Sequence, residues 1–189
     1  MFERLFLLII AFILPGCAVD FDDYEPIRFE VSGTSVTMNG VITSDITGKL
    51  QTLLNKHPEI TTIIMETVDG SVDDEANLEA ARLVRAKGLN TIISGHGEVA
   101  SGGTDFFLAG VNRTVERGAK VGVHSWAALG INDANSLPKD HPEHQNYLKY
   151  YQEMGIPDDF YWFTLASASS SDMHWMSPKE QKLYKISTP

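Results

Sequence analysis

The strongest constraint on the fold is the alternation of strand-like and helix-like segments that begins at residue 35. Short runs rich in β-branched residues occur at 35–42, 60–66 and 90–94, and the segments 44–58 and 69–88 between them carry apolar residues at helical spacing. Such alternation is typical of a largely parallel sheet covered by helices. A chain of 189 residues is long enough for one such domain, so we expect a single α/β domain.

The two predicted helices differ in how clearly their ends are marked. Within 69–88, the acidic residues 73–75 would lie in the first turn and Arg85 and Lys87 in the last, where they complement the helix macrodipole. Gly88 can close this helix. For the helix within 44–58, Ser44 is the expected cap, and the helix stops before Pro58.

The alternation continues to residue 124. A glycine-rich turn follows the strand at 90–94, and a short helix at 104–110 and strands at 113–116 and 120–124 come next. The final third is predicted to contain a polar loop or lid at 128–144 and aromatic-rich helices within 145–155 and 157–169. The aromatic residues favour a core and subunit interface, with a pocket for a peptide side chain as the alternative.

Residues 1–17 are set apart as an export signal. The apolar run Leu5–Leu14 after Arg4 is too short to span a bilayer and matches a secretory signal. The sequence from Leu14 to Cys17 resembles a bacterial lipobox, which predicts lipidation of Cys17; an ordinary signal peptide followed by a stray thiol is the alternative. Residues 18–34 would form an acidic tether and a first strand, and residues 35–189 the folded domain.

The negative net charge of the chain indicates which kinds of molecule it can bind. The formal net charge is −10 and the fifteen Lys and Arg residues are scattered. Nucleic-acid binding needs clustered basic residues, so we expect no nucleic-acid partner. Peptides or unfolded proteins remain as the favoured ligands.

Residues 95–110, "GHGEVASGGTDFFLAG", place one serine at a predicted strand-to-helix turn. Small neighbours let the backbone approach a bound carbonyl closely, and the amides of Gly102 and Gly103 would open the helix that follows Ser101. A structural turn is the competing interpretation. A serine nucleophile also needs a base, an orienting carboxylate and oxyanion donors.

Two further residues are candidates for those roles. Gly70 lies at the preceding strand-to-helix turn, and the turns after adjacent parallel strands share one edge of the sheet. Its N–H is therefore a candidate oxyanion donor, or else part of a tight turn that needs positive φ. His124 ends the strand at 120–124, and a satisfied structural histidine is the alternative there.

Four segments together resemble the proteolytic subunit of the Clp-type serine peptidases, within the Clp/crotonase superfamily. They are "VTMNGVITSDITGKLQTLLNKHPEITTIIMETVDGSV", "ASGG", "AKVGVHSW" and "DMHWMSPKEQKLYKI", in that order, covering about residues 35–186. The resemblance implies a Clp/crotonase-like spiral of ββα units in a single domain. It also implies a homo-oligomer.

The resemblance implies a Ser-His-Asp triad. Ser101 matches the nucleophile, His124 the general base, and Gly70 and Gly102 the two oxyanion-hole positions. Asp172 is the expected third member, with one residue more than usual between it and the "WMSP" stretch. The family's paired-glycine strand motif is also altered, because it reads Val68-Asp69-Gly70 here, so substrate preference does not carry over.

Two other motifs in the sequence correspond to different chemistries, a Ser-Lys peptidase mechanism and a metal site. "ASGG" also resembles the signal-peptide peptidases, which use a Ser-Lys pair; Lys120 and Lys149 are present, but the segment with the lysine base has no match. The motif His141-Pro142-Glu143-His144 offers two imidazoles without a third ligand, which favours a solvated helix start over a metal site.

The sequence thus predicts a serine peptidase-like hydrolase that cleaves peptides through an acyl-enzyme, without a metal or cofactor. It would be exported and held as a lipoprotein at the periplasmic face of a bacterial membrane, so it would act without a cytosolic unfoldase. The main alternative is an inactive Clp-fold lipoprotein that binds peptides or proteins. A crotonase-like acyl-CoA enzyme is a third possibility. It would need a pocket for adenine and phosphate groups, and the acidic composition does not favour such a pocket.

Overall fold

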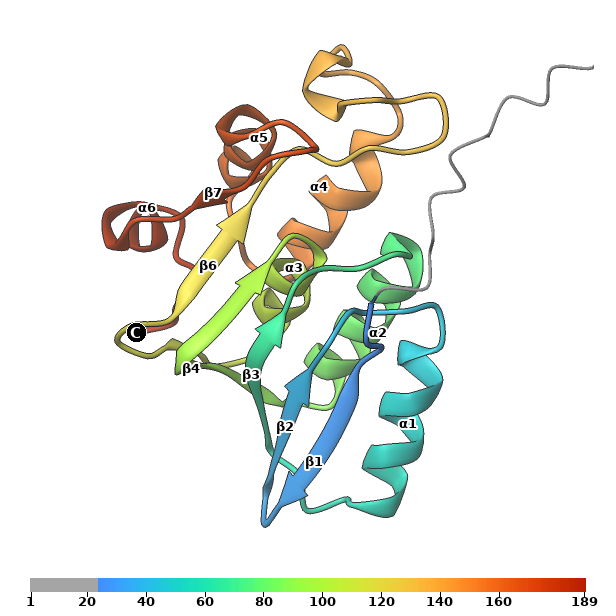
Figure 1. The fold of residues 1–189 in the computed structure, drawn as a ribbon, viewed down its shortest axis with the longest axis vertical. Coiled ribbons are helices and arrows are strands. Elements are labelled where there is room, and N and C mark those ends of the chain that lie inside the picture. Colours follow the sequence, from blue (N-terminus) through green and yellow to red (C-terminus); the bar gives the residue numbers. More distant parts are fainter. Residues whose placement is uncertain (1–23) are drawn as a thin grey trace, which may run out of the picture.

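The computed structural model describes residues 24–189, which form one mixed sheet with helices packed against it (Figure 1). The strands are β1 (Arg28–Ser32), β2 (Ser35–Asn39), β3 (Thr62–Val68), β4 (Asn90–Ala100), β5 (Arg113–Val115), β6 (Lys120–Val123) and β7 (His174–Trp175). The helices are α1 (Ile46–Lys56), α2 (Asp74–Ala86), α3 (Gly102–Leu108), the 3-10 helix η1 (Ala134–Ser136), α4 (His144–Glu153), α5 (Asp158–Ser167) and α6 (Pro178–Leu183).

The sheet is parallel at its centre and antiparallel at its edges. Its strand order is β1-β2-β3-β4-β6-β7, with β5 paired to β4 beside this path. Strands β2, β3, β4 and β6 run parallel, and β1 and β7 pair antiparallel with β2 and β6. The predicted α/β fold with a largely parallel sheet is therefore confirmed. Because the central strands point the same way, their carboxyl ends share one edge, at the top of Figure 1.

Strand β4 is longer than the sequence predicted. The expected glycine-rich turn after residue 94 was wrong, because the strand continues through Gly95 and Gly97 to Ala100. The first half of β4 pairs with β5, and the second half with β6. Between these halves β4 contains extra residues relative to β3, because Met65 pairs with Ile93 and Thr67 pairs with Glu98. A Cβ on Gly97 would lie 3.0 Å from two carbonyl oxygens of β3, so the glycine permits this close passage.

Helix α1 begins later than expected. Asp45, not Ser44, precedes its first residue Ile46, and neither side chain caps the free N–H groups of α1. Thr43 instead donates a hydrogen bond to the Asp45 carboxylate at 2.6 Å. Helix α2 follows the prediction more closely, because Asp73 caps it by accepting from the Ala76 N–H at 3.0 Å.

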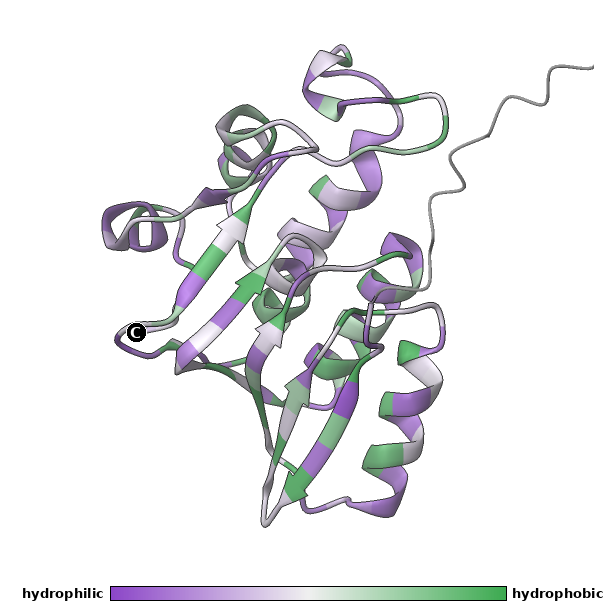
Figure 2. Cartoon of the chain, in the orientation of Figure 1, coloured by the Kyte–Doolittle hydropathy of each residue, from purple (hydrophilic) through white to green (hydrophobic). Residues whose placement is uncertain are grey.

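The core lies between the sheet and the helices. Its fully buried side chains come from every layer, for example Ile46 of α1, Ile63 of β3 and Phe106 of α3. Hydrophobic and polar residues alternate along the strands and around α1, as Figure 2 shows. The predicted role of the aromatic residues in the core is confirmed for Tyr150, Tyr161 and others that are buried.

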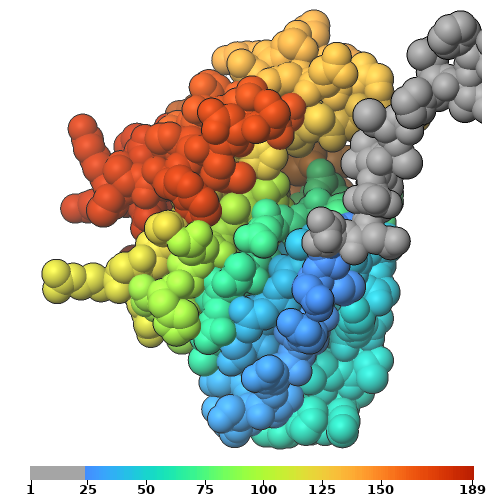
Figure 3. Space-filling model, in the orientation of Figure 1, coloured from blue at the N-terminus to red at the C-terminus, as the bar shows by residue number. Residues whose placement is uncertain are grey.

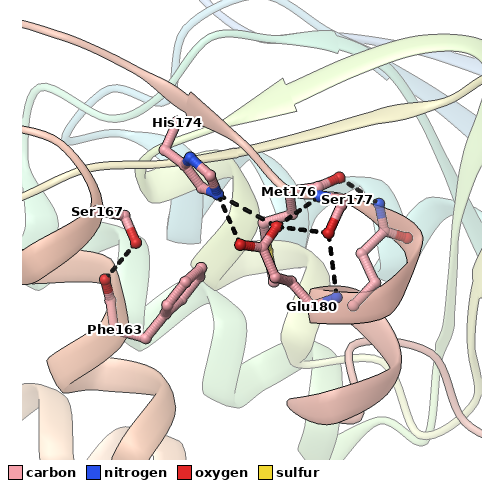
Figure 4. A network of polar contacts seen from close by, with 7 residues as sticks. Phe163, Ser167, His174, Met176, Ser177 and Glu180 are labelled. Carbon is pink, nitrogen blue, oxygen red and sulfur yellow. Dashed lines mark hydrogen bonds and ion pairs between the residues drawn. The ribbon is translucent and has the colours of Figure 1, made fainter.

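The C-terminal third covers the upper and left part of the molecule in Figure 3, and its last residues lie against the start of β5, where Thr188 donates to the Arg113 carbonyl at 3.0 Å. Strand β7 pairs with β6, and α6, the last helix, follows it. Ser177 and Glu180 form a capping box at the start of α6, and His174 lies 3.2 Å from the Glu180 carboxylate (Figure 4). These contacts fix how the chain approaches β6.

The predicted signal at 1–17, including Cys17, lies outside the described residues. Within the expected tether at 18–34, β1 pairs along its whole length with β2. Among residues 24–189, no helix has both the length and the apolar character needed to cross a bilayer.

Candidate active site

Ser101 occupies the sharp turn between β4 and α3. Its backbone has φ 54° and ψ −131°, a conformation that non-glycine residues rarely adopt and that costs about 1–3 kcal/mol. The Ser101 N–H donates to the carbonyl of Gly122 in β6 at 3.1 Å, which holds the turn against the neighbouring strand. A strained serine at a strand-to-helix turn also exposes the nucleophilic hydroxyl of the α/β-hydrolases.

The start of α3 is packed too tightly for any residue except glycine. A Cβ on Gly102 would lie 2.2 Å from the Ser71 hydroxyl, and one on Gly103 would lie 2.6 Å from the Val68 carbonyl. The buried Asn77 side chain donates to the Gly102 carbonyl at 2.8 Å. Because Gly102 is the first residue of α3, its N–H has no partner within the helix and stays available beside Ser101.

Gly70 lies directly against the serine side chain. Its φ of 147° is in the range that favours glycine, and a Cβ there would lie 3.2 Å from the Ser101 Cβ and 3.4 Å from its Oγ. The Gly70 carbonyl accepts from Ile42. Its N–H makes no hydrogen bond within residues 24–189, so two free backbone donors, those of Gly70 and Gly102, flank Ser101.

His124 follows β6 and lines the same cavity as Ser101. Its Nδ1 is buried and has no hydrogen-bond partner in the described chain, and no hydrogen bond joins its ring to Ser101 there. The structure thus brings the predicted nucleophile and base to one cavity without completing the contacts of a triad. Catalytic hydrogen bonds are often long in unliganded enzymes, so this geometry is compatible with a general base.

Asp172, the expected third triad residue, lies on an exposed turn before β7. Its carboxylate accepts from the neighbouring Met173 N–H at 2.8 Å, and the described residues show no hydrogen bond from it to His124. The register of β7 explains this. His174 pairs with Val123, and the sulfur of Met173 packs against Gly122, so the extra residue carries Asp172 beyond the end of the strand pair.

A different carboxylate, that of Asp133, lies in the loop that follows His124. Asp133 precedes η1 and accepts from the Asn135 N–H at 2.9 Å. Its pKa is lowered chiefly by a hydrogen bond from Ser125, and to a smaller degree by backbone hydrogen bonds and by the charge of His124. No sequence pattern singled out Asp133, because it lies in the segment that was expected to be a polar loop.

The cavity beside Ser101 contains acidic and aromatic side chains that the sequence analysis did not assign to a site. Its volume is about 40 Å³, and its lining includes Asp74, Asp105, Tyr147 and Tyr151. Tyr147 donates to the Asp74 carboxylate at 2.5 Å, and Tyr151 to that of Asp105 at 2.6 Å. The signal in the sequence was the position of Asp105 one helical turn after Ser101, which puts both residues on the same side of α3.

The lysines considered as alternative bases lie elsewhere. Lys120 is exposed and pairs with Glu98 at 2.5 Å, and Lys149 is exposed on α4. Neither lines the cavity at Ser101. The Ser-Lys arrangement therefore has no support from their positions.

The predicted solvated helix start at residues 141–144 was wrong for His144. This histidine is fully buried, with Nδ1 2.6 Å from the Tyr161 hydroxyl and Nε2 3.1 Å from the Pro138 carbonyl. Its imidazole thus anchors the loop to α5. Within residues 24–189, no three His, Cys, Asp or Glu side chains lie close enough to hold a metal ion.

Several solved structures have a fold similar to that of this chain. ClpP1 from Listeria monocytogenes, solved as a mutant, is 17% identical with a TM-score of 0.56, over 82% of this chain and 89% of that one. A mutant of the 1510-N membrane-bound stomatin-specific protease is 15% identical with a TM-score of 0.53, over 81% and 75%. Human enoyl Coenzyme A hydratase domain-containing protein 3 is 8% identical with a TM-score of 0.52, over 87% and 70%.

These similarities define a Clp/crotonase fold, which confirms the predicted fold class. By sequence, no family model and no curated protein matches the chain. The fold is shared by peptidases and by enoyl-CoA hydratases, so function has to be argued from the site.

Proposed function

We propose that this protein is a serine hydrolase that cleaves peptide bonds. The observation that carries the proposal is the strained Ser101 at the β4–α3 turn, flanked by the free N–H groups of Gly70 and Gly102, with His124 in the same cavity. His124 would accept the Ser101 proton as the hydroxyl attacks the substrate carbonyl. The two N–H groups and the N-terminus of α3 would stabilise the oxyanion.

In the second half of the reaction, protonated His124 would return its proton to the leaving amine. Water would then attack the acyl-enzyme, and the same imidazole would act as base again. No step in this sequence draws on a metal or cofactor.

The orienting carboxylate of the proposed mechanism has two candidates. Asp172 fills the role implied by the resemblance, and it reaches His124 only if the turn before β7 rearranges. Asp133 is the second candidate, because the hydrogen bond that chiefly lowers its pKa comes from Ser125, the residue after His124, and the charge of His124 is the smallest of the causes. Replacing each by Asn separates them: we expect Asp133→Asn to slow labelling of Ser101 about tenfold or more, and Asp172→Asn to change it less than about twofold.

Labelling by a fluorophosphonate probe tests the proposal. The folded wild type should be labelled, and both Ser101→Ala and His124→Ala should abolish labelling. Ser169→Ala is the matched control, because Ser169 is exposed and contacts only Ser171 through its hydroxyl. A folded wild type that resists the probe would contradict the proposal.

A second function, binding without turnover, is favoured by one observation. His124 has neither a carboxylate on Nδ1 nor a hydrogen bond to Ser101 within the described chain. A protein of this kind would bind peptides at the same cavity. It would bind them reversibly, and its folded wild type would show no covalent labelling.

Exported location, lipid attachment and assembly remain part of the proposal. Cys17 would carry the lipid, and peptides or unfolded proteins outside the cytoplasm would be the substrates. Homo-oligomerisation is proposed from the resemblance alone. Metabolic incorporation of a fatty-acid analogue, lost in Cys17→Ser, tests the anchor.

A further inference from the structure

The cavity beside Ser101 is acidic as well as aromatic. Asp74 enters it from the first turn of α2 and Asp105 from α3, and the rings of Trp126, Tyr147 and Tyr161 stand around them. These three rings stack in one series, with centroids 5.7 Å and 5.6 Å apart. The stack is held at its ends by the Trp126 indole N–H, which donates to the Tyr161 hydroxyl at 2.9 Å.

Within the described part of the chain, the carboxylate of Asp105 has only one of its two oxygens hydrogen-bonded. One of its oxygens accepts from Tyr151, whereas the other has no hydrogen-bond partner within residues 24–189. Burial raises its pKa to about 7, against the effect of the Tyr151 hydrogen bond, and the charge of Asp74 raises it further. The protein therefore keeps a second acid next to Asp74 at a site where its charge is disfavoured.

No cation of the described chain neutralises these two acids. None of the ion pairs within residues 24–189 includes Asp74 or Asp105. Nearby arginines are engaged elsewhere: Arg82 pairs with Glu153 at 2.5 Å, and Arg85 donates to the carbonyls of Leu108 and Met154. Among the described residues, Asp74 is held by hydrogen bonds alone, from the Ser71 and Tyr147 hydroxyls, so a cationic ligand would be the first positive charge to face the two acids.

A larger outer cavity continues the acidic character. It has a volume of about 360 Å³ and shares Asp74, Trp126 and Tyr147 with the inner one. Glu75 and Glu143 also line it, together with Arg82, whose guanidinium pairs with Glu153 at 2.5 Å. Its size is within the range of ligand-binding clefts, so it offers room for the residues of a peptide that extend away from the reacting carbonyl.

We propose that the inner cavity binds the ammonium group of a lysine side chain, so that the hydrolase cleaves peptides next to lysine. This inference rests on the proposed function for its catalytic meaning. The unpaired oxygen of Asp105 and the carboxylate of Asp74 supply the charge, and the aromatic walls enclose the methylene stem. A volume of about 40 Å³ holds about three water-sized groups, which suits an ammonium group better than a planar guanidinium.

Binding to the Ser101→Ala protein tests the inference without requiring turnover. Two tetrapeptide amides that differ only in lysine or norleucine compare a cationic side chain with an uncharged one that has the same four side-chain carbons and no ammonium group. We expect calorimetry to show at least about tenfold tighter binding of the lysine peptide, and weaker binding of an arginine peptide than of the lysine one. In the Ser101→Ala/Asp105→Asn protein the preference for lysine over norleucine should fall to about twofold or less.

Glu79→Gln, introduced in the same Ser101→Ala background, is the control, because it removes one negative charge from an exposed position on α2. It should leave the preference unchanged. Equal binding of the two peptides would overturn the inference, as would a preference that survives Asp105→Asn. Because this binding is measured without the nucleophile, a failure of the wild type to react with a fluorophosphonate would count against the proposed hydrolysis and not against the lysine site.

Discussion

At the scale of single residues, the proposed oxyanion hole depends on how closely the backbone of Gly70 approaches Ser101. A side chain at residue 70 would meet the serine Cβ at 3.2 Å, and the φ of 147° would strain any other residue. Position 70 therefore combines a conformational requirement with a functional one. The sequence could suggest the glycine as a turn or as an oxyanion donor, and only the structure shows that it lies against the serine.

Gly70→Ala separates those two requirements when it is compared with Gly33→Ala. Both glycines have positive φ, but a Cβ on Gly33 would meet nothing within 4 Å. We expect each variant to lower the free energy of unfolding by about 1–2 kcal/mol, because alanine is strained at such φ values. Gly70→Ala alone should also slow fluorophosphonate labelling about 100-fold or more, since an oxyanion donor is displaced. Equal labelling of the two variants would remove Gly70 from the site.

Asp105 gives a second prediction at this scale, on stability against pH. Its folded-state pKa is about 7, against 3.8 for a free side chain, so between these values the folded protein holds a proton that the unfolded chain has released. Stability contributed by this group is therefore present at low pH and is lost as pH rises through 7. Asp105→Asn keeps the Tyr151 hydrogen-bond acceptor without the charge.

Urea unfolding at pH 5 and pH 8 measures this effect. The gain of Asp105→Asn over wild type should be larger at pH 8 than at pH 5. A difference between variant and wild type that does not grow with pH would show that Asp105 is not disfavoured as an anion.

At the scale of secondary-structure elements, β4 and β7 decide which residues reach the site. β4 changes partner from β5 to β6 along its length, and this brings Ser101 beside His124. β7 sets the position of Asp172 through its register with β6. Neither the change of partner nor the register follows from local periodicity, because both depend on strands far apart in the sequence.

The capping box of α6 lies directly after β7, so removing the Ser177 hydroxyl should destabilise this part of the fold. Ser177→Ala removes the hydroxyl that accepts from the Glu180 N–H and donates to its carboxylate. We expect a loss of about 1 kcal/mol in the free energy of unfolding, measured in urea, with little change in labelling of Ser101. Ser187→Ala, close to the C-terminus and outside this cap, is the control. A labelling rate that falls together with the cap would instead show that β7 also positions His124.

At the scale of the whole molecule, the sequence predicted the architecture better than the site. The alternating pattern and the segment order were enough for the fold, and for placing Ser101, His124, Gly70 and Gly102 in one region. The acidic and aromatic cavity was not predicted. It joins α2, α3 and α4 through contacts such as Tyr147 with Asp74, 73 residues apart in the chain, and such pairs leave no local signal.

The same fold carries peptidases and enoyl-CoA hydratases among the proteins it resembles. What distinguishes the chemistry here is the serine at the strained turn. The proposed mechanism requires an acyl group on Ser101, whereas addition of water to a carbon–carbon double bond leaves no acyl group on a serine.

Detection of that acyl group is the most direct test of the central claim. We would mix the folded protein with an activated ester of a lysine-containing peptide, quench within the first turnover, and locate the adduct by mass spectrometry. The account predicts one acyl group per chain on Ser101, absent from Ser101→Ala and retained in Ser169→Ala. A folded wild type that carries no acyl group, or carries it on another residue, would contradict the account.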